Sequence, residues 1–322
     1  MIKYAVIGAG WRAEFYLRIA NLLPEIFSVS AVFVRNPEKA KEIKEKYKAN
    51  VVTTLEQMLK SDFDFIVNCV NKTNIVPTIN QLCEKGYAVL SETPVTENIN
   101  PDYRVQVAEQ FHFQPRNMAI KRVIDSGIIG EVTGVKISAC HDYHAGSLIR
   151  FFLGTKNEMP KSQTINLPDR VMRYNCRAGL ITPELVENTQ KITVFEFKNK
   201  TAIYDFTFEQ YFSDIRATQI TVRGTHGEIV NDKVTYLKDG VPHTFKLTRN
   251  AFGINENLDG FSLFSITGNG ETLYQNPFPN VRFSDEEIAI ATCLLKMDTY
   301  LKKGEEFYPV SDAVLDSEMF DL

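Results

Sequence analysis

A short glycine-containing segment lies directly after the first apolar run of the chain and before the first helix-like stretch. It reads Gly8-Ala9-Gly10-Trp11-Arg12-Ala13 and follows the strand-like residues Tyr4 to Ile7. In this setting Gly8 allows a tight turn, Gly10 lets the backbone approach a pyrophosphate, and the helix N-terminus offers N–H groups to the anion. The segment therefore predicts a dinucleotide-binding loop; a glycine turn that binds no nucleotide is the alternative.

The residues after the second predicted strand bear on which dinucleotide would bind. A site that prefers NAD has an acidic side chain there, which bonds the ribose diol. This chain has Val34-Arg35-Asn36-Pro37 instead. Because a guanidinium suits a phosphate, Arg35 favours NADP over NAD, although an exposed arginine at the start of a loop is the simpler alternative.

The elements that must position this loop alternate regularly. Short β-type runs alternate with helix-period segments, which is the pattern of βαβ units and a doubly wound parallel sheet. The predicted strands are Tyr4 to Ile7, Val29 to Val34, Val51 to Thr53, Phe65 to Val70 and Ala88 to Leu90. The predicted helices lie near Ala13 to Leu23, Pro37 to Tyr47, Leu55 to Leu59 and Val76 to Lys85.

The chain changes character near Pro115, where a helix to about Gly127 is expected. Strands are then predicted at 132–140, 192–197, 202–208 and 219–222. A final helix is expected at about 285–303, because Ser284 and Glu287 form a capping-box pattern before it. The predicted fold class is α/β: an N-terminal Rossmann domain over 1–118, then an α+β domain over 119–322 that binds substrate, mediates oligomerisation and contains a largely antiparallel open sheet.

Composition excludes several classes of function. The 322 residues carry 36 basic and 40 acidic side chains, a formal net charge of −4, so we expect no nucleic-acid partner. No apolar run reaches membrane-spanning length and no signal-peptide pattern precedes the first strand, so we expect no membrane insertion. The five scattered cysteines have no metal-ligand spacing, which predicts no metal site and fits a reducing, cytoplasmic location.

Several segments together resemble the family of glucose-fructose oxidoreductase, inositol dehydrogenase and MocA-like oxidoreductases, over nearly the whole chain. They are VIGAGWRAEF, Ser91-Glu92-Thr93-Pro94, IDSGIIGEVTGVKIS, His144 followed by Arg150 and Leu153-Gly154, and DEEIAIATCLLKM. The resemblance implies an NAD(P)-dependent oxidoreductase that transfers a hydride between nicotinamide and a sugar-like or cyclitol-like substrate. It also implies a homodimer or homotetramer that forms through the open sheet, where residues 192–197 alternate apolar side chains on one face.

The sequence departs from this family at the expected reaction centre. The family's Glu-Lys-Pro triplet appears as Glu92-Thr93-Pro94, and Cys140 occupies the place of an aspartate. Thr93 cannot replace the lysine as a cation or as a general acid. Lys72, just past the fourth predicted strand, is one alternative source of the cation, and a solvated loop lysine is the simpler interpretation.

His144 matches the family's histidine and is the expected catalytic base, because a neutral imidazole can accept a hydroxyl proton as hydride leaves. A hydrogen-bonded structural histidine is the alternative. Asp142 could replace the missing acid, but on an extended segment it would point to the opposite face from His144.

The expected cofactor contacts come from loops at the carboxyl ends of the predicted strands. They are Gly8, Gly10, Trp11, Arg12, Arg35, Asn71, Glu92 and Thr93. Because two catalytic positions are altered, two rival functions stay open. One is a dinucleotide-binding regulatory or catalytically impaired protein, and the other is a lyase or glycosidase that retains its cofactor without net oxidation.

Overall fold

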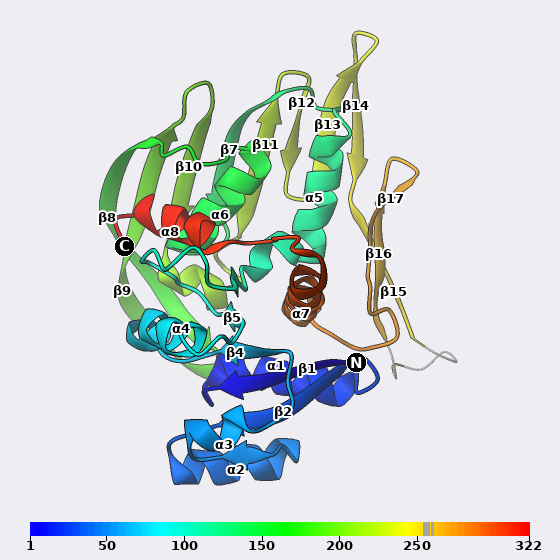
Figure 1. Ribbon diagram of the computed structural model, residues 1–322. Coiled ribbons are helices and arrows are strands. Elements are labelled where there is room, and N and C mark those ends of the chain that lie inside the picture. Colours follow the sequence, from blue (N-terminus) through cyan, green and yellow to red (C-terminus); the bar gives the residue numbers. More distant parts are fainter. Residues whose placement is uncertain (254–257, 259–260) are drawn as a thin grey trace. The chain divides into compact units, whose positions relative to one another are not determined.

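The computed structural model describes residues 1–253, 258 and 261–322, and the chain divides into two compact units (Figure 1). The first unit comprises Met1–Pro115, Ala251–Phe264 and Asn276–Val314. The second unit comprises Arg116–Asn250, Ser265–Gln275 and Leu315–Leu322. Each unit is therefore assembled from three separate stretches of the chain.

Six parallel strands form the sheet of the first unit, in the order β3-β2-β1-β4-β5-β6. Their bounds are β1 (Ile2–Ile7), β2 (Phe27–Phe33), β3 (Val51–Val52), β4 (Phe65–Asn68), β5 (Val89–Ser91) and β6 (Val105–Val107). The first five strands are connected through α1 (Trp11–Leu22), α2 (Pro37–Tyr47), α3 (Leu55–Leu59), the 3₁₀ turn η1 (Lys72–Asn74) and α4 (Ile75–Cys83). The predicted doubly wound sheet is confirmed, and its strand order reverses at β1, which lies between β2 and β4.

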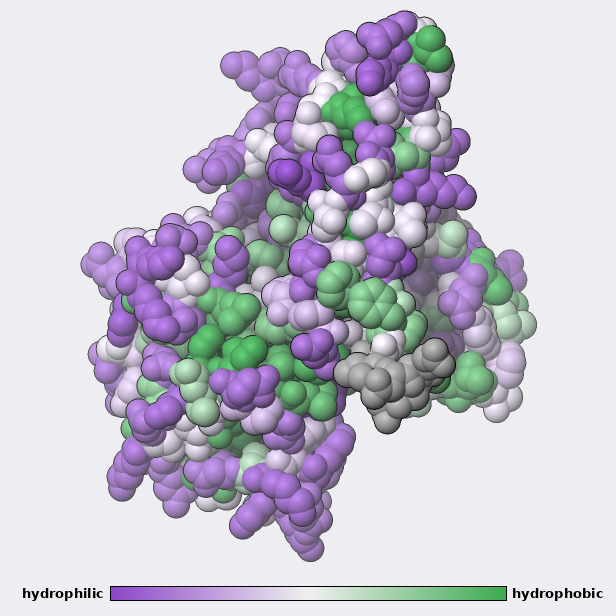
Figure 2. All heavy atoms as spheres, turned by 90° about the vertical axis from the view of Figure 1, so that its right-hand side faces the viewer, coloured by the Kyte–Doolittle hydropathy of each residue, from purple (hydrophilic) through white to green (hydrophobic). Residues whose placement is uncertain are grey.

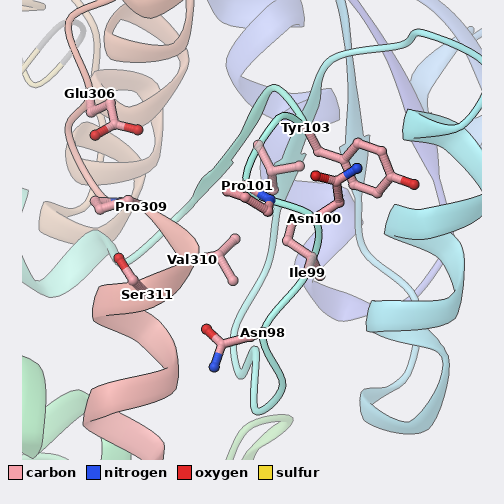
Figure 3. Close-up of a pocket in the computed structure, with 10 residues that line it drawn as sticks. Asn98, Ile99, Asn100, Pro101, Tyr103, Glu306, Pro309, Val310 and Ser311 are labelled. Carbon is pink, nitrogen blue, oxygen red and sulfur yellow. The ribbon is translucent and has the colours of Figure 1, made fainter.

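The connection between β5 and β6 lacks the usual crossover helix. Residues 92–104 contain no helix, and a C-terminal segment packs against this part of the sheet instead. Gln106 Oε1 accepts the N–H groups of Phe307 at 2.9 Å and Tyr308 at 2.8 Å, and Val107 N–H donates to Tyr308 O at 2.8 Å. A cavity of about 220 Å³ remains between residues 98–105 and 306–311 (Figure 3).

Helix α7 (Asp285–Lys303) packs on α1 within the first unit. It begins at Ser284, whose hydroxyl accepts the N–H of Glu287 while the Glu287 carboxylate accepts the N–H of Ser284. It ends at Gly304, which adopts a left-handed conformation with φ +72°. A further helix, α8 (Val310–Glu318), follows α7 and was not predicted from the sequence.

The second unit contains an eight-stranded sheet in the order β14-β13-β12-β11-β7-β10-β9-β8. All its neighbours pair antiparallel except β7 and β10, so the predicted, largely antiparallel sheet is confirmed. The strands are β7 (Val132–Ser138), β8 (Lys161–Cys176), β9 (Gly179–Glu196), β10 (Thr201–Phe206), β11 (Gln219–Gly224), β12 (Gly227–Val230), β13 (Lys233–Lys238) and β14 (Val241–Lys246). A third sheet has the order β15-β16-β17, with β15 (Thr248–Phe252), β16 (Ser262–Gly268) and β17 (Glu271–Gln275).

Helices α5 (Pro115–Asp125) and α6 (Asp142–Leu153) lie on one face of the eight-stranded sheet (Figure 1). Side chains that point to this face are buried, such as Phe195 and Tyr204. Their neighbours along the strands point the other way, and Val194 and Ile203 are 46% and 38% exposed. One face of β9 and β10 therefore carries exposed apolar side chains at alternate positions.

Hydrophilic residues cover much of the face in Figure 2, with apolar residues gathered in patches between them. Within the described part of the chain, no helix combines the length and apolar character needed to cross a membrane. None of the five cysteines forms a disulfide bond, and four of them are buried.

Candidate functional site

The glycine loop follows β1 and leads into α1. Gly8 has φ +114°, a conformation that side-chain-bearing residues rarely adopt, and its N–H donates to Phe33 O at 3.1 Å. A Cβ on Gly8 would lie 2.4 Å from the carbonyl oxygen of Cys69 at the end of β4. Glycine is therefore required here, because it lets the turn pass close to the neighbouring strand.

Gly10 is the N-cap of α1 and meets a different constraint. Its backbone is extended, with φ −75°, and a Cβ built on it would have no atom within 4 Å. No side chain caps the first turn of α1, so the helix N-terminus presents its N–H groups beside open space. Trp11, which begins the helix, is 38% exposed.

Arg12 is held by three polar groups of the first unit. Its Nε lies 3.3 Å from Glu92 Oε2 and its Nη1 donates to Glu286 Oε1 at 2.8 Å. With its amide oriented to satisfy both neighbours, Gln110 accepts from Arg12 Nη2 at 3.1 Å. The guanidinium also lies 4.6 Å from the Trp11 ring centroid. Arg12 thus links α1, the segment after β5 and α7.

Glu92 is buried in the same cluster. The Tyr16 hydroxyl donates to its Oε1 at 2.5 Å, while Arg12 faces Oε2. Burial raises the pKa of Glu92, and Arg12 and the Tyr16 hydrogen bond oppose that rise. Burial lowers the pKa of Arg12, but the carboxylates of Glu92 and Glu286 more than compensate and hold it above its usual value.

Glu109 is a second buried carboxyl of the first unit, only 2% exposed. Its Oε1 accepts the N–H of Phe111 at 3.1 Å. Burial raises the pKa of Glu109 to about 8, although the Phe111 hydrogen bond and the Arg12 charge act in the opposite direction. Glu109 therefore holds a proton in the folded protein at neutral pH.

The remaining predicted cofactor residues follow other strands of the same sheet. Arg35 is exposed after β2 and makes no ion pair with any residue that the structure describes. Asn71 is exposed after β4, and its Oδ1 accepts from Asn74 Nδ2 at 2.5 Å. Thr93 is half-buried after β5, whereas Lys72 is exposed on η1. The carboxyl ends of β1, β2, β4 and β5 thus carry all eight predicted contacts.

Asn68 lies at the carboxyl end of β4 and was not predicted from the sequence. It is fully buried, and its Nδ2 donates to Ile75 O at 3.3 Å and Ser91 Oγ at 3.4 Å. Its Oδ1 has no hydrogen-bond partner among the described residues. Such an atom is an acceptor that a ligand's donor would satisfy.

His144 lies in α6 of the second unit and is 4% exposed. Its ring is 4.4 Å from that of Tyr143 and 5.1 Å from that of His141, measured between centroids. His141 is the N-cap residue of α6 and is half-buried. Both its backbone N–H and its ring Nδ1 contact the hydroxyl of Tyr211, at 2.7 Å and 2.5 Å.

Asp142 is the first residue of α6, so the expectation that it lies on an extended segment is wrong. Its φ is +31°. Its Oδ1 accepts from Lys191 Nζ at 3.2 Å and from the Tyr204 hydroxyl at 3.5 Å. The carboxylate is therefore paired with a cation that comes from β9.

The sequence analysis missed the residues that contact Arg12 and those that contact the first residues of α6. Gln110 and Glu286 complete the surroundings of Arg12, and Tyr211 and Lys191 complete those of His141 and Asp142. No local pattern marks these residues, because each lies far along the chain from the group it contacts. Within the described residues, no group of three or more His, Cys, Asp and Glu side chains is arranged to hold a metal ion.

Comparison with known proteins found a matching family model and solved structures with a similar fold. A model of the oxidoreductase family with the NAD-binding Rossmann fold matches residues 2–111. No curated protein sequence matches the chain.

Three solved structures share the fold over almost the whole chain. One is a levoglucosan dehydrogenase in complex with NADH and levoglucosan, with 14% identity and a TM-score of 0.69 over 99% of this chain and 95% of that chain. The second is an oxidoreductase from Agrobacterium radiobacter in complex with NAD+, L-tartaric acid and magnesium, with 16% identity and a TM-score of 0.64 over 99% of this chain and 94% of that chain. The third is a myo-inositol dehydrogenase from Corynebacterium glutamicum ATCC 13032, with 14% identity and a TM-score of 0.63 over 99% of this chain and 94% of that chain. The resemblance inferred from the sequence motifs is confirmed. Residues 2–111 match the model of the Gfo/Idh/MocA oxidoreductase family with its NAD-binding Rossmann fold, and the solved structures extend the likeness in fold to almost the whole chain.

Proposed function

We propose that this protein is an NAD(P)-dependent oxidoreductase that moves a hydride between nicotinamide and the carbinol or carbonyl carbon of a sugar-like or cyclitol-like substrate. The observation that carries the proposal is the glycine loop. Gly8 leaves no room for a side chain, and Gly10 places uncapped N–H groups beside open space at the point where the strand order reverses. The solved structures that share the fold include dehydrogenases of levoglucosan and myo-inositol.

The residues of the first unit fit a dinucleotide. The loop and the α1 N-terminus would bind the pyrophosphate, with Trp11 beside it, while Asn71 and Thr93 line the same edge of the sheet. Arg35 would bind the 2′-phosphate of NADP, since it is exposed and makes no ion pair with the described residues. NADP is accordingly the proposed preference over NAD.

Arg12 and Glu92 play a supporting part in this proposal. The Arg12 guanidinium binds the carboxylates of Glu92 and Glu286, and the Glu92 carboxylate also accepts a hydrogen bond from Tyr16. This cluster would fix the first turn of α1 against the segment after β5, and so hold the loop and Thr93 in one arrangement.

When bound, nicotinamide supplies the position that accepts or donates the hydride. The protein must then exchange the proton of the substrate hydroxyl. We assign this exchange to His144 in α6, which occupies the family's position.

Gly10→Ala tests dinucleotide binding directly. The substitution fits the backbone and the empty space around Gly10, so folding should be unaffected, but the new methyl group occupies the position of an approaching pyrophosphate. We expect the Kd for NADPH, measured by fluorescence, to rise at least about tenfold. Gly134→Ala in β7 is the matched control, because its Cβ would make only an ordinary contact, with Thr201 of β10 at 3.5 Å. Equal affinities in both variants would contradict the assignment.

A panel of sugars and inositols with both cofactors tests turnover and separates the rivals. Reduction of free NAD(P)+ by an alcohol supports the oxidoreductase. Tight cofactor binding without turnover supports the regulatory alternative, which Thr93 and Cys140 favour because they replace the family's lysine and aspartate. Product release without net reduction supports the lyase or glycosidase. Thr93→Lys, which restores the cation, is expected to raise turnover.

We also propose that the protein forms a homo-oligomer through the exposed face of β9 and β10. Val194 and Ile203 lie on this face with Ile165, and all three are at least 38% exposed. An apolar sheet face of this kind is typically covered by a partner.

A further inference from the structure

We propose that Glu286, in the first turn of α7, positions the N-terminus of α1 for the dinucleotide by holding the side chain of Arg12. Glu286 lies 274 residues beyond Arg12 in the sequence and belongs to the same unit. It acts through Arg12, so it is a positioning residue. The role rests on the proposed oxidoreductase function, because it makes part of the cofactor affinity depend on α7.

The first turn of α1 lacks the side chain that usually secures the start of a helix. A capping side chain accepts hydrogen bonds from the first N–H groups of the helix. Those are the groups that a pyrophosphate requires, so a cap would compete with the cofactor. Gly10 occupies the capping position and avoids this competition, but it leaves the turn without its usual support.

Arg12 provides another support from the second position of α1. Its Nη1 donates to Glu286 Oε1 at 2.8 Å, its Nε lies 3.3 Å from Glu92 Oε2, and Gln110 accepts from its Nη2 at 3.1 Å. Three acceptors therefore fix the guanidinium, and only 18% of the side chain is exposed. These contacts involve the side chain of Arg12, so they hold the first turn without using the N–H groups that the anion needs.

Glu286 is the acceptor that comes from a separate helix with a fixed start. The capping box of Ser284 and Glu287 surrounds it in the sequence and secures the first turn of α7. A carboxylate at this place is also stabilised by the helix dipole. Glu286 therefore offers Arg12 an acceptor whose backbone is held in place.

The contact with Glu286 is also the shorter of the two carboxylate contacts of Arg12. Glu92 lies farther away and shares its charge with the Tyr16 hydroxyl, which donates to Oε1 at 2.5 Å. Burial lowers the pKa of Arg12, but the two carboxylates more than compensate and hold it above its usual value. The guanidinium therefore stays charged, and the Glu286 contact is a charge-assisted hydrogen bond.

The charge of Glu286 gives the proposal a decisive sign. A carboxylate close to the start of α1 opposes the approach of a pyrophosphate, so removing its charge alone would tighten dinucleotide binding. Removing its hold on Arg12 would instead loosen the first turn and weaken binding. The two effects of Glu286 thus change the Kd in opposite directions.

A second arginine–glutamate pair between the same two helices serves as the control. Arg18 Nε donates to Glu287 Oε1 at 2.9 Å. Arg18 lies in the second half of α1, so this pair supports the packing of α7 on α1 without holding the glycine loop. Arg18→Met therefore removes a comparable contact away from the first turn.

The first test measures the Kd values for NADPH and NADH by fluorescence in the wild type, Glu286→Ala and Arg18→Met. A first turn that adopts the binding arrangement about one tenth of the time binds about tenfold more weakly, so we expect the Kd of Glu286→Ala to rise about tenfold. Arg18→Met should keep the wild-type Kd. Glu286→Gln, which keeps an acceptor oxygen, should recover part of the affinity. An unchanged or lower Kd in Glu286→Ala, or an equal rise in Arg18→Met, overturns the proposal.

Hydrogen exchange of the cofactor-free protein provides a second test. The backbone N–H groups of Glu14 and Phe15 close the first turn of α1. We expect them to exchange faster in Glu286→Ala than in the wild type and at the wild-type rate in Arg18→Met. A wild type that binds neither NADPH nor NADH refutes the proposed function and this inference with it. A wild type that binds, together with unchanged exchange in Glu286→Ala, refutes the inference alone.

Discussion

Glu109→Gln should make the first unit more stable at neutral pH. The Glu109 carboxyl is 2% exposed and has a pKa of about 8, compared with 4.5 for an unperturbed glutamate. Because the folded protein binds this proton more tightly than the unfolded chain, stability falls as the pH rises above about 4.5 and levels off above about 8. Glutamine resembles the protonated acid, keeps an oxygen to accept the N–H of Phe111, and removes this dependence.

The size of the effect follows from the same pKa values. At pH 7 the unfolded carboxyl is ionised while the folded one holds its proton, and about 2.5 pH units at about 1.4 kcal/mol per unit give roughly 3 kcal/mol. Glu109→Gln should therefore exceed the wild type in free energy of unfolding by up to about 3 kcal/mol at pH 7. At pH 4 the wild type and Glu109→Gln should be equally stable, because the Glu109 carboxyl is then largely protonated in both the folded and the unfolded wild type.

The protein contains a suitable probe. Trp11 is the single tryptophan and lies in the first unit with Glu109, so its fluorescence during urea unfolding reports on that unit. Glu97→Gln is the matched control, since it removes the same charge from an exposed position. Parallel pH profiles for the wild type and Glu109→Gln between pH 4 and pH 8 would refute the assignment of a buried, protonated Glu109.

Three further predictions concern the cofactor loop and the open sheet. Arg35→Asp should shift the ratio of the Kd values for NADPH and NADH towards NADH, because it replaces a phosphate partner with a ribose partner; an unchanged ratio would remove Arg35 from the site. Arg12→Met should lower the free energy of unfolding by about 3 kcal/mol, because it leaves the buried Glu92 carboxylate with only the Tyr16 hydroxyl as a partner. Urea unfolding followed by tryptophan fluorescence measures this loss, and a loss of less than about 1 kcal/mol would contradict the importance of the Arg12–Glu92 pair. The wild type should behave as an oligomer in light scattering and Val194→Asp should weaken its association, whereas a wild-type monomer at micromolar concentration would contradict an interface on this face.

Local patterns were enough to predict five of the six strands of the first sheet and the glycine loop, but not β6. Helices and strands that alternate along the chain follow from hydrophobic periodicity, and the Gly8 to Ala13 segment is read within a few residues of β1. The α7 capping box is equally local, because Ser284 and Glu287 are three residues apart. The β5–β6 connection was not foreseen, because the segment that covers it, around Tyr308, lies about 200 residues along the chain from Gln106.

The candidate sites likewise contain residues that local patterns predict and contacts that depend on distant segments of the chain. Local sequence patterns predicted that Gly8, Gly10 and Arg35 follow strands of one parallel sheet, because these roles depend on backbone conformation and on position along the chain. It placed Asp142 on an extended segment, where the structure has the start of a helix. Only the tertiary structure brought Glu286 to Arg12 and Tyr211 to His141, across separations of 274 and 70 residues. Burial and contacts with distant residues shift the pKa values of Arg12 and Tyr211, and both arise only when distant segments pack together.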